Sequence, residues 1–380
     1  MHIAVFSDSY LPYRSGVVRS IATFAEELKR AGHRVFIFAP RYGSEEREED
    51  VFRFPSVRAP NFKEFALALP WAPGLKQALR RWEVDLIHVH SPFLLGGLGA
   101  RVAKELGLPL IFTYHTLYEL YVHYFPLAPG MARRLVRKFT INFCNRCDAV
   151  IAPTREIASF LQANGVKVRV EVIPTGIVLA DYEEADPGWL RRQTGLSENE
   201  TILLYVGRLG KEKNVDFLLR SFARLWREAP WVHLVLVGSG PWEGFLRREV
   251  SRLGVERAVH FLGAFPFNEM PRIYKGADVF VFASMTETQG LVLAEAKAAG
   301  LPIVAVAAYG VKEMVRHGID GFLVPPEEEV FAATLKEIIM NRDLRLQLGT
   351  RARENALELS SSAMAERLMK LYQDVITCKE

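Results

Sequence analysis

Residues 201–207, TILLYVG, form an apolar run that ends in glycine and is followed by the charged segment RLGKEKN. Continuously apolar runs of this length are typical of strands buried on both faces of a parallel sheet. Similar runs alternate with longer amphipathic stretches along the whole chain: HIAVF, HRVFIFA, VDLIHVH, LPLIFTYH, DAVIAPT, WVHLVLVG, AVHFLG, DVFVFAS and PIVAVA. This alternation predicts an α/β protein built from Rossmann-like, doubly wound parallel sheets.

The chain of 380 residues is long enough for two such domains. The alternation is interrupted at 176–200, where acidic residues, glycine and proline are frequent. We therefore expect an N-terminal domain at 1–175, a linker at 176–200 and a C-terminal domain at 201–359, with the two domains facing a cleft. A last helix at about 360–380 is expected to pack back on the first domain, because the second already has its strands.

Composition narrows the class of protein further. Hydrophobic residues make up 49% of the chain and charged residues 24%, which is ordinary for a globular protein. No apolar run reaches the roughly 18 residues of a membrane-spanning helix, so a cytoplasmic protein is expected. Residues 1–175 carry 23 Lys and Arg against 16 Asp and Glu, a net +7, whereas the rest carries 25 against 28, a net −3. The N-terminal domain is therefore the part expected to meet an acidic partner or surface.

Metal and disulfide chemistry have little support in the sequence. Cys144 and Cys147 form a C-x-x-C, but no second cysteine pair or suitably spaced histidine follows to complete a zinc site. His88 and His90 share one face of a strand without a third ligand in view. No Asp-x-Asp occurs anywhere, so activity is expected not to need a divalent metal. No cofactor is expected either.

Ligands of open α/β folds bind beyond the carboxyl ends of the strands, so the loops that follow strands are the candidate sites. Gly16 follows the first strand and precedes a helical pattern, where its backbone can approach a phosphate; a plain turn is the alternative. His115 lies at the end of another strand, in TYHTLYE. Arg208 and Lys213 share the loop after residue 207 and can clamp a diphosphate, unless they are only solvated surface charges.

The segment TETQGLVLAEAKAAG, residues 286–300, places Gly290 at the start of a helix, where free amides can bind an anionic oxygen. Glu287 lies in the loop before this helix and Glu295 lies on its first turns. Because carboxylates repel phosphate, their expected use is to accept hydrogen bonds from hydroxyl groups, one on a ribose and one on a sugar. The combination predicts a nucleotide-sugar site.

These motifs resemble those of the family 4 retaining glycosyltransferases, which have the GT-B fold of two Rossmann-like domains. The resemblance covers nearly the whole chain and rests on the E-x7-E of Glu287 and Glu295, on GRLGKEKN, on VIPTGI and on VGSGP. It implies that Glu295 holds the ribose, Glu287 a hydroxyl of the donor sugar, and His115 the sugar near the reacting carbon. Arg208 and Lys213 would hold the diphosphate. The resemblance also implies backbone contacts to the donor around Gly16, Gly290, Leu291 and Val292. Many members have Phe where this chain has Gln289, so the contact beside the sugar is expected to differ.

The segments FTYHTLYELYVHY and FCNRCDAVIAPT are similar to one branch of that family, the bacterial diacylglycerol glucosyltransferases. This similarity implies transfer of a hexose, glucose, from UDP-glucose to diacylglycerol or a related membrane lipid. A soluble or polysaccharide acceptor and a non-catalytic nucleotide-sugar-binding protein are the alternatives. A nicotinamide dehydrogenase is disfavoured, because GSGPWEG is one residue too long for G-x-G-x-x-G.

The segment ARRLVRKFTINF, residues 132–143, is expected to form an amphipathic helix. At 100° per residue one face is basic, with Arg133, Arg134, Arg137 and Lys138. The opposite face is apolar, with Leu135, Val136, Phe139 and Phe143. Such a helix either packs its apolar face into the domain or lies at a lipid surface. We expect reversible, peripheral binding to the anionic inner face of the plasma membrane through this helix, with a second contribution from NFKEFALALPWAPGL, residues 61–75.

Overall fold

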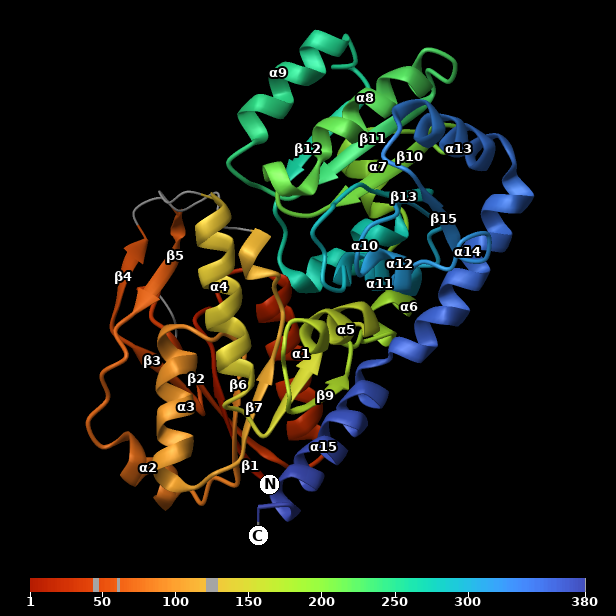
Figure 1. Cartoon of the computed structure of the whole chain (residues 1–380). Coiled ribbons are helices and arrows are strands. Elements are labelled where there is room, and N and C mark those ends of the chain that lie inside the picture. Colours follow the sequence, from red (N-terminus) through yellow and green to blue (C-terminus); the bar gives the residue numbers. More distant parts are fainter. Residues whose placement is uncertain (44–47, 60–61, 121–128, 380) are drawn as a thin grey trace. The chain divides into compact units, whose positions relative to one another are not determined.

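The computed structural model describes residues 1–43, 48–59, 62–120 and 129–379. It contains two compact units (Figure 1). The first unit consists of Met1–Gly176 together with Ser361–Glu380, and the second consists of Ile177–Ser360. Each unit is built on one large parallel sheet, so the predicted α/β fold with two doubly wound domains is confirmed.

The first unit has a seven-stranded parallel sheet in the order β3-β2-β1-β6-β7-β8-β9. Every residue of its central strands β6, β7 and β8 is buried, because helices cover both faces, as their unbroken apolar sequence predicts. The strands are β1 (His2–Phe6), β2 (Arg34–Pro40), β3 (Val51–Phe54), β6 (Leu86–Val89), β7 (Leu110–Thr113), β8 (Ala149–Ala152) and β9 (Arg169–Val172).

The remaining elements of the first unit are helices and one antiparallel pair of strands, β4 (Ser56–Ala59) and β5 (Phe62–Ala68). The helices are α1 (Gly16–Arg30), α2 (Leu75–Arg81), α3 (Leu94–Leu106), η1 (Tyr118–Leu120), α4 (Pro129–Cys144), α5 (Arg155–Ala163) and α15 (Ser361–Thr377).

The helix α15 packs on the first unit, against α1 and the sheet. The Ser361 hydroxyl donates to Glu27 Oε1 at 2.6 Å, and Arg169 pairs with Asp374 at 3.0 Å. Tyr372 is fully buried, and its hydroxyl lies 2.7 Å from His88 Nδ1. The last helix is therefore part of the core of the first unit.

The second unit has a six-stranded parallel sheet in the order β12-β11-β10-β13-β14-β15. Its strands are β10 (Thr201–Val206), β11 (Val232–Val237), β12 (Val259–Gly263), β13 (Val279–Phe282), β14 (Ile303–Val306) and β15 (Gly321–Val324). Its helices include α8 (Val215–Trp226), α9 (Glu243–Leu253), α10 (Met270–Lys275), α11 (Leu291–Ala298), α12 (Val311–Met314), α13 (Glu328–Met340) and α14 (Arg342–Ala356).

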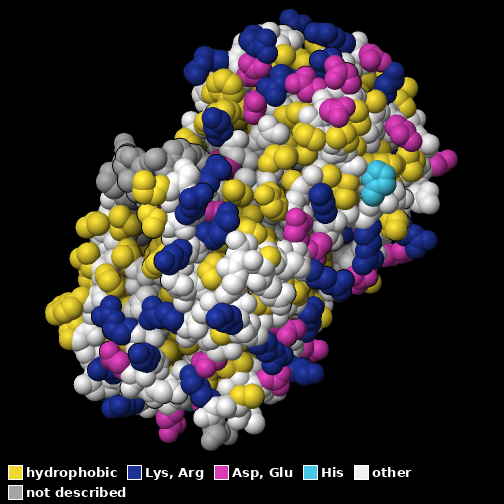
Figure 2. Space-filling view, viewed as in Figure 1, with side chains coloured by type: hydrophobic (Ala, Val, Ile, Leu, Met, Phe, Trp, Pro, Cys, Tyr) yellow, Lys and Arg dark blue, Asp and Glu magenta, His cyan; other side chains and the backbone are white. Residues whose placement is uncertain are grey.

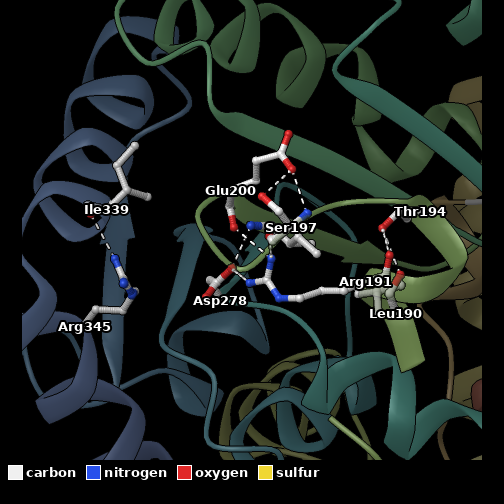
Figure 3. A network of polar contacts seen from close by, with 9 residues as sticks. Leu190, Arg191, Thr194, Ser197, Glu200, Asp278, Ile339 and Arg345 are labelled. Carbon is white, nitrogen blue, oxygen red and sulfur yellow. Dashed lines mark hydrogen bonds and ion pairs between the residues drawn. The ribbon is translucent and has the colours of Figure 1, made fainter. Parts of the chain in front are cut away.

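The segment at 176–200, which we expected to be a linker, forms two short helices, α6 (Ala180–Glu183) and α7 (Trp189–Thr194). From Ile177 onward it belongs to the second unit. The Arg191 guanidinium donates to the carbonyl oxygens of Ser197 (2.6 Å) and Glu200 (2.9 Å) within the segment, and it pairs with Asp278 at 2.9 Å (Figure 3). Asp278 also accepts from the amide of Ile202 on β10 at 2.8 Å, which connects the segment to the sheet. Acidic residues and glycine suggested an open connection here, but the buried side chain of Leu190 and this network pack the segment against the unit.

Each sheet reverses its strand order once, between β1 and β6 in the first unit and between β10 and β13 in the second. Such a switch point opens a crevice at the carboxyl ends of the two strands, which is where open α/β sheets bind ligands. The loops after these four strands are therefore where each unit is expected to hold a ligand.

Candidate active site

Two loops meet at the switch point of the second unit, 207–214 after β10 and 283–290 after β13. Lys213 Nζ forms an ion pair with Glu287 Oε1 across this point, and their side chains are 17% and 15% exposed. The side-chain amide of Asn214 donates to the carbonyl oxygen of Ala283 at 3.3 Å. The structure thus brings together one cation and one carboxylate that the sequence analysis had placed on separate loops.

Arg208 lies on the same loop as Lys213, with its side chain 35% exposed. Its guanidinium is 3.9 Å from the carboxylate of Glu212, which is only 4% exposed. The carboxylate of Glu212 therefore lies close enough to attract the Arg208 guanidinium. Glu212 was not identified from the sequence.

Two glycines allow other backbone segments to pack directly against the loops at 207–214 and 283–290. A Cβ on Gly238 would lie 1.9 Å from the carbonyl oxygen of Gly207, and one on Gly310 would lie 2.2 Å from that of Thr288. Gly238 also has a φ of 138°, which favours glycine. The VGSGP motif is therefore explained by close packing of backbone on backbone.

Gly290 caps α11 with a left-handed conformation, φ 76° and ψ 62°. The half-buried Leu291 and Val292 follow at the first two helical positions, where backbone amides have no intrahelical acceptor. Gln289 is 5% exposed, so its side chain belongs to the interior of the loop. The helix start can therefore present amides to an anion, as the sequence predicts.

Glu295 lies on α11 and is 6% exposed, so it is more deeply buried than Glu287. Its Oε2 accepts a hydrogen bond from the hydroxyl of Tyr274, on α10, at 2.7 Å. Tyr274 was not identified from the sequence, since it lies 21 residues before Glu295 and in no motif. The two glutamates of the E-x7-E therefore differ in partner: Glu287 pairs with a cation and Glu295 with a neutral hydroxyl.

His115 follows β7 in the first unit and is half-buried. Its Nε2 lies 2.8 Å from Nδ1 of His90, which is 3% exposed, and the two ring planes are only 20° apart, with centroids at 5.1 Å. Burial lowers the pKa of His115 to about 3, so its imidazole is neutral near pH 7. His90 is a further residue that the sequence analysis had not connected with His115.

Gly16 is exposed at the start of α1, whose N-cap is Ser15. The Ser15 hydroxyl oxygen accepts from the amide of Val18 at 3.3 Å. A Cβ on Gly16 would meet no atom within 4 Å, so packing within the unit does not require glycine there.

The basic helix is α4, and Arg133, Arg134, Arg137 and Lys138 are all exposed on it. Lys and Arg side chains gather on the surface over this helix (Figure 2). Arg137 differs from the other three, because its Nε lies 3.3 Å from the buried carboxylate of Glu119.

The apolar side of α4 differs from the expectation. Leu135 and Phe139, expected to lie opposite the bases and available for packing, are 56% and 47% exposed. The helix instead buries Ala132, Thr140, Ile141, Phe143 and Cys144. Together with Met131, which is 63% exposed, Leu135 and Phe139 form what we call the α4 stripe. At 100° per residue, Arg134 and Lys138 lie beside this stripe on the helix surface.

The described residues contain no group of three His, Cys, Asp or Glu side chains suited to a metal ion. Burial raises the pKa of the Cys144 thiol to about 12, so the C-x-x-C is not a reactive pair. Within the same described residues, none of the helices is long and apolar enough to cross a membrane.

Comparison with known proteins identifies this architecture. Residues 14–181 match the family model Glycosyltransferase Family 4, and residues 189–355 match Glycosyl transferases group 1. HepE of Anabaena, solved in complex with UDP, superposes with a TM-score of 0.79 at 22% identity, covering 98% of this chain and 100% of HepE. The fold is that of the GT-B glycosyltransferases.

Several curated relatives match along nearly the whole chain, among them two of the same name and a GDP-mannose-dependent alpha-mannosyltransferase of Corynebacterium glutamicum, 28% identical over 395 residues, covering 100% of this chain and 90% of the relative. The alpha-monoglucosyldiacylglycerol synthase of Streptococcus pneumoniae is 34% identical over 387 residues, covering 99% of this chain and 86% of the relative. The enzyme of the same name from Acholeplasma laidlawii is 30% identical over 390 residues, covering 99% and 98%. The chain belongs to glycosyltransferase family 4, and the family resemblance seen in the sequence is confirmed.

Proposed function

We propose that the chain transfers glucose from UDP-glucose to a hydroxyl group of diacylglycerol or a related membrane lipid, with retention of the anomeric configuration. The observation that carries this proposal is the whole-chain similarity to alpha-monoglucosyldiacylglycerol synthases of two different bacteria. A family 4 enzyme with a soluble or polysaccharide acceptor and a non-catalytic nucleotide-sugar-binding protein remain the alternatives.

The leaving diphosphate would be held by the loop after β10 and the start of α11. Departure of UDP builds negative charge on the β-phosphate. Lys213, Arg208 and the amides of Gly290, Leu291 and Val292 would stabilise that charge, in place of a metal ion. A single preorganised donor of this kind contributes about 3 kcal/mol, by analogy with oxyanion holes.

The Lys213–Glu287 pair explains how a carboxylate can lie near a diphosphate. The ammonium offsets the negative charge of Glu287, so this carboxylate repels the phosphates less than an unpaired one would. Glu287 would then accept a hydrogen bond from a donor-sugar hydroxyl while Lys213 contacts the diphosphate. In the first unit, His115 would contact the sugar near the reacting carbon, and the backbone at Gly16 would approach a phosphate.

Glu295 is suited to neutral hydroxyls, because its carboxylate already accepts one from Tyr274. A carboxylate offers about four lone-pair sites, so ribose hydroxyls can share it. For the transfer we propose front-face attack. The acceptor oxygen bonds to the anomeric carbon on the face from which UDP leaves, and its proton passes to the departing phosphate oxygen.

We propose that α4 brings the enzyme to the lipid. The α4 stripe would enter the interface while Arg133, Arg134 and Lys138 attract anionic headgroups, each base contributing about 1 kcal/mol. The segment after β5 would add further apolar surface, since Leu69 and Trp71 there are 51% and 76% exposed.

A panel assay tests the function. The chain is incubated with labelled UDP-glucose, UDP-galactose or GDP-mannose, and with diacylglycerol vesicles, glycerol or a soluble glucan. We expect an α-linked glucosyl lipid from UDP-glucose, unaffected by EDTA. A soluble product instead would favour the first alternative, and donor binding without any product would favour the second.

Vesicle co-sedimentation tests the membrane contact. Binding is expected to rise with the anionic lipid fraction, to fall with salt, and to weaken when Arg133, Arg134, Arg137 and Lys138 become Ser. A charge-matched control changes four exposed arginines of the second unit to Ser: Arg247, Arg248, Arg252 and Arg257. Equal binding by wild type and the α4 variant would exclude this helix as the anchor.

A further inference from the structure

Three histidines lie together near the switch point of the first unit, and the function proposed above uses only one of them. His88 and His90 are 1% and 3% exposed, and their ring centroids are 4.1 Å apart. His90 Nδ1 lies 2.8 Å from Nε2 of His115, the residue assigned to the sugar. The buried rings of His88 and His90 therefore lie next to His115, a proposed substrate contact.

We propose that His90 is a positioning residue for the transfer reaction, because its Nδ1 fixes the tautomer and the ring orientation of His115. Buried contacts that reach Tyr372 on α15 hold His90 in place. The inference rests on the proposed function, since it deepens the role given there to His115.

The charge state of the three rings determines which of their nitrogens can donate a hydrogen bond. Burial lowers the pKa of His88 and of His115 to about 3 and that of His90 well below its ordinary value, so all three are neutral near pH 7. A neutral imidazole has one N–H donor and one acceptor nitrogen. In a hydrogen bond between two such rings one nitrogen donates and the other accepts. The hydrogen bond therefore couples the proton position on His115 to that on His90.

The backbone of His90 is held at several points. Its amide donates to the carbonyl oxygen of Phe6 at 2.9 Å. The hydroxyl of Ser91 donates to Asp8 Oδ2 at 2.6 Å and accepts from the amide of Asp8 at 3.1 Å. A Cβ on Gly96 would lie 1.6 Å from the carbonyl oxygen of Ser91, so only glycine lets α3 start this close to the segment. These contacts hold the backbone at His90 in place.

The ring of His90 also contacts the ring of His88, with 36° between the two planes. Nδ1 of His88 lies 2.7 Å from the Tyr372 hydroxyl, and its Nε2 lies 2.7 Å from Thr113 Oγ1. Both nitrogens of the neutral His88 ring are therefore engaged, so the ring cannot rotate without losing a buried hydrogen bond. The C-terminal helix α15 thus takes part in fixing His115 through Tyr372.

Nuclear magnetic resonance of the full chain with ¹⁵N-labelled histidine tests the geometry without any turnover. We expect a ¹⁵N–¹⁵N coupling across the hydrogen bond between His90 and His115, with the His115 signals identified from a His115→Asn variant. In His90→Leu the coupling should vanish and the ring ¹⁵N shifts of His115 should move toward a mixture of tautomers. No coupling in wild type, or unchanged His115 shifts in His90→Leu, would overturn the inference.

Kinetics supply the second test. His90→Leu is expected to lower kcat about 100-fold while leaving nucleotide affinity unchanged, because it misorients His115 without removing a donor contact. His90→Asn keeps an amide near the place of Nδ1 and should recover most of that loss. A kcat equal to wild type in His90→Leu would refute the positioning role.

A control variant for His90→Leu breaks a similar contact between two imidazole rings in the second unit. His233 Nδ1 lies 3.1 Å from His260 Nε2 in the second unit, and His233→Leu should leave kcat close to wild type. An equal loss of kcat in this control would mean that His90→Leu acts by general destabilisation. If His90→Leu does not fold, the wild-type coupling and His90→Asn still decide the question. If wild type transfers no sugar at all, the proposed function fails, while the spectra still decide how His90 holds His115.

Discussion

Replacing Lys213 by Ala is expected to lower kcat/KM for the nucleotide-sugar by about 10²- to 10³-fold. The side chain is 17% exposed and lies at the switch point between β10 and β13, so its charge is only partly screened by water. Two unit charges 4 Å apart attract by about 4 kcal/mol at an effective dielectric constant of 20. Loss of one preorganised donor to a developing anion costs about 2.7–4 kcal/mol, which corresponds to the stated factor.

Lys213→Ala also leaves the half-buried carboxylate of Glu287 without its cation. The unpaired carboxylate then repels the diphosphate. A Lys213→Ala, Glu287→Gln double variant should therefore bind UDP more tightly than Lys213→Ala alone. Arg208→Ala should also lose at least about 10²-fold in kcat/KM, because Arg208 contacts the same leaving group in our proposal.

The assay is steady-state transfer from labelled UDP-glucose to diacylglycerol vesicles, with thermal unfolding to confirm that each variant is folded. Lys211→Ala is the matched control, since Lys211 is an exposed lysine on the same loop. It should remain within about twofold of wild type, as surface substitutions usually do. Wild-type kcat/KM in both Lys213→Ala and Arg208→Ala, or equal losses in Lys211→Ala, would refute the assignment of the diphosphate to this loop.

Three further predictions concern the ribose, the metal and pH. Glu295→Gln should weaken UDP binding in calorimetry, whereas Glu287→Gln should mainly lower kcat; unchanged UDP affinity in Glu295→Gln would remove its ribose role. Activity should survive EDTA, and a loss that Mg²⁺ or Mn²⁺ restores would contradict a metal-free mechanism. Stability should fall as pH drops from about 6.5 toward 3, because the unfolded chain takes up protons there that buried His88, His90 and His115 cannot accept. Each histidine would remove up to about 1.4 kcal/mol per pH unit, so equal urea-unfolding free energies at pH 7.5 and 5 would contradict the burial of these rings.

The sequence predicted the features that depend on local patterns. Strands such as β10 and β13 are recognisable because burial on both faces demands an unbroken apolar run. The start of α11 at Gly290 follows from glycine before a helical pattern, and the loop position of Glu287 follows from that boundary. The ion pair between Lys213 and Glu287 could not be predicted from either loop alone. It depends on β10 and β13 being neighbours in the sheet.

Features that depend on tertiary packing were not predictable in this way. The short strand β3 lies at the sheet edge and β4 pairs only with β5, so neither has a continuous apolar signature. Tyr274 and Glu295, like His90 and His115, come from different elements, and no spacing rule connects them. On α4, periodicity correctly indicated a basic surface, but which apolar side chains are buried depends on how the helix is rotated against its neighbours. That rotation leaves Leu135 exposed.

The division of the first unit between Met1–Gly176 and Ser361–Glu380 has a consequence for biosynthesis. A ribosome releases the N-terminal residues first, yet the unit they belong to lacks α15 until the whole second unit has been synthesised. The second unit is one continuous segment, so it can fold before the last helix of the first unit has been synthesised. During that interval the surfaces that α15 will cover, including the ring of His88, are open to water and to other nascent chains. We expect these surfaces to be the part of the newborn polypeptide that most needs a chaperone.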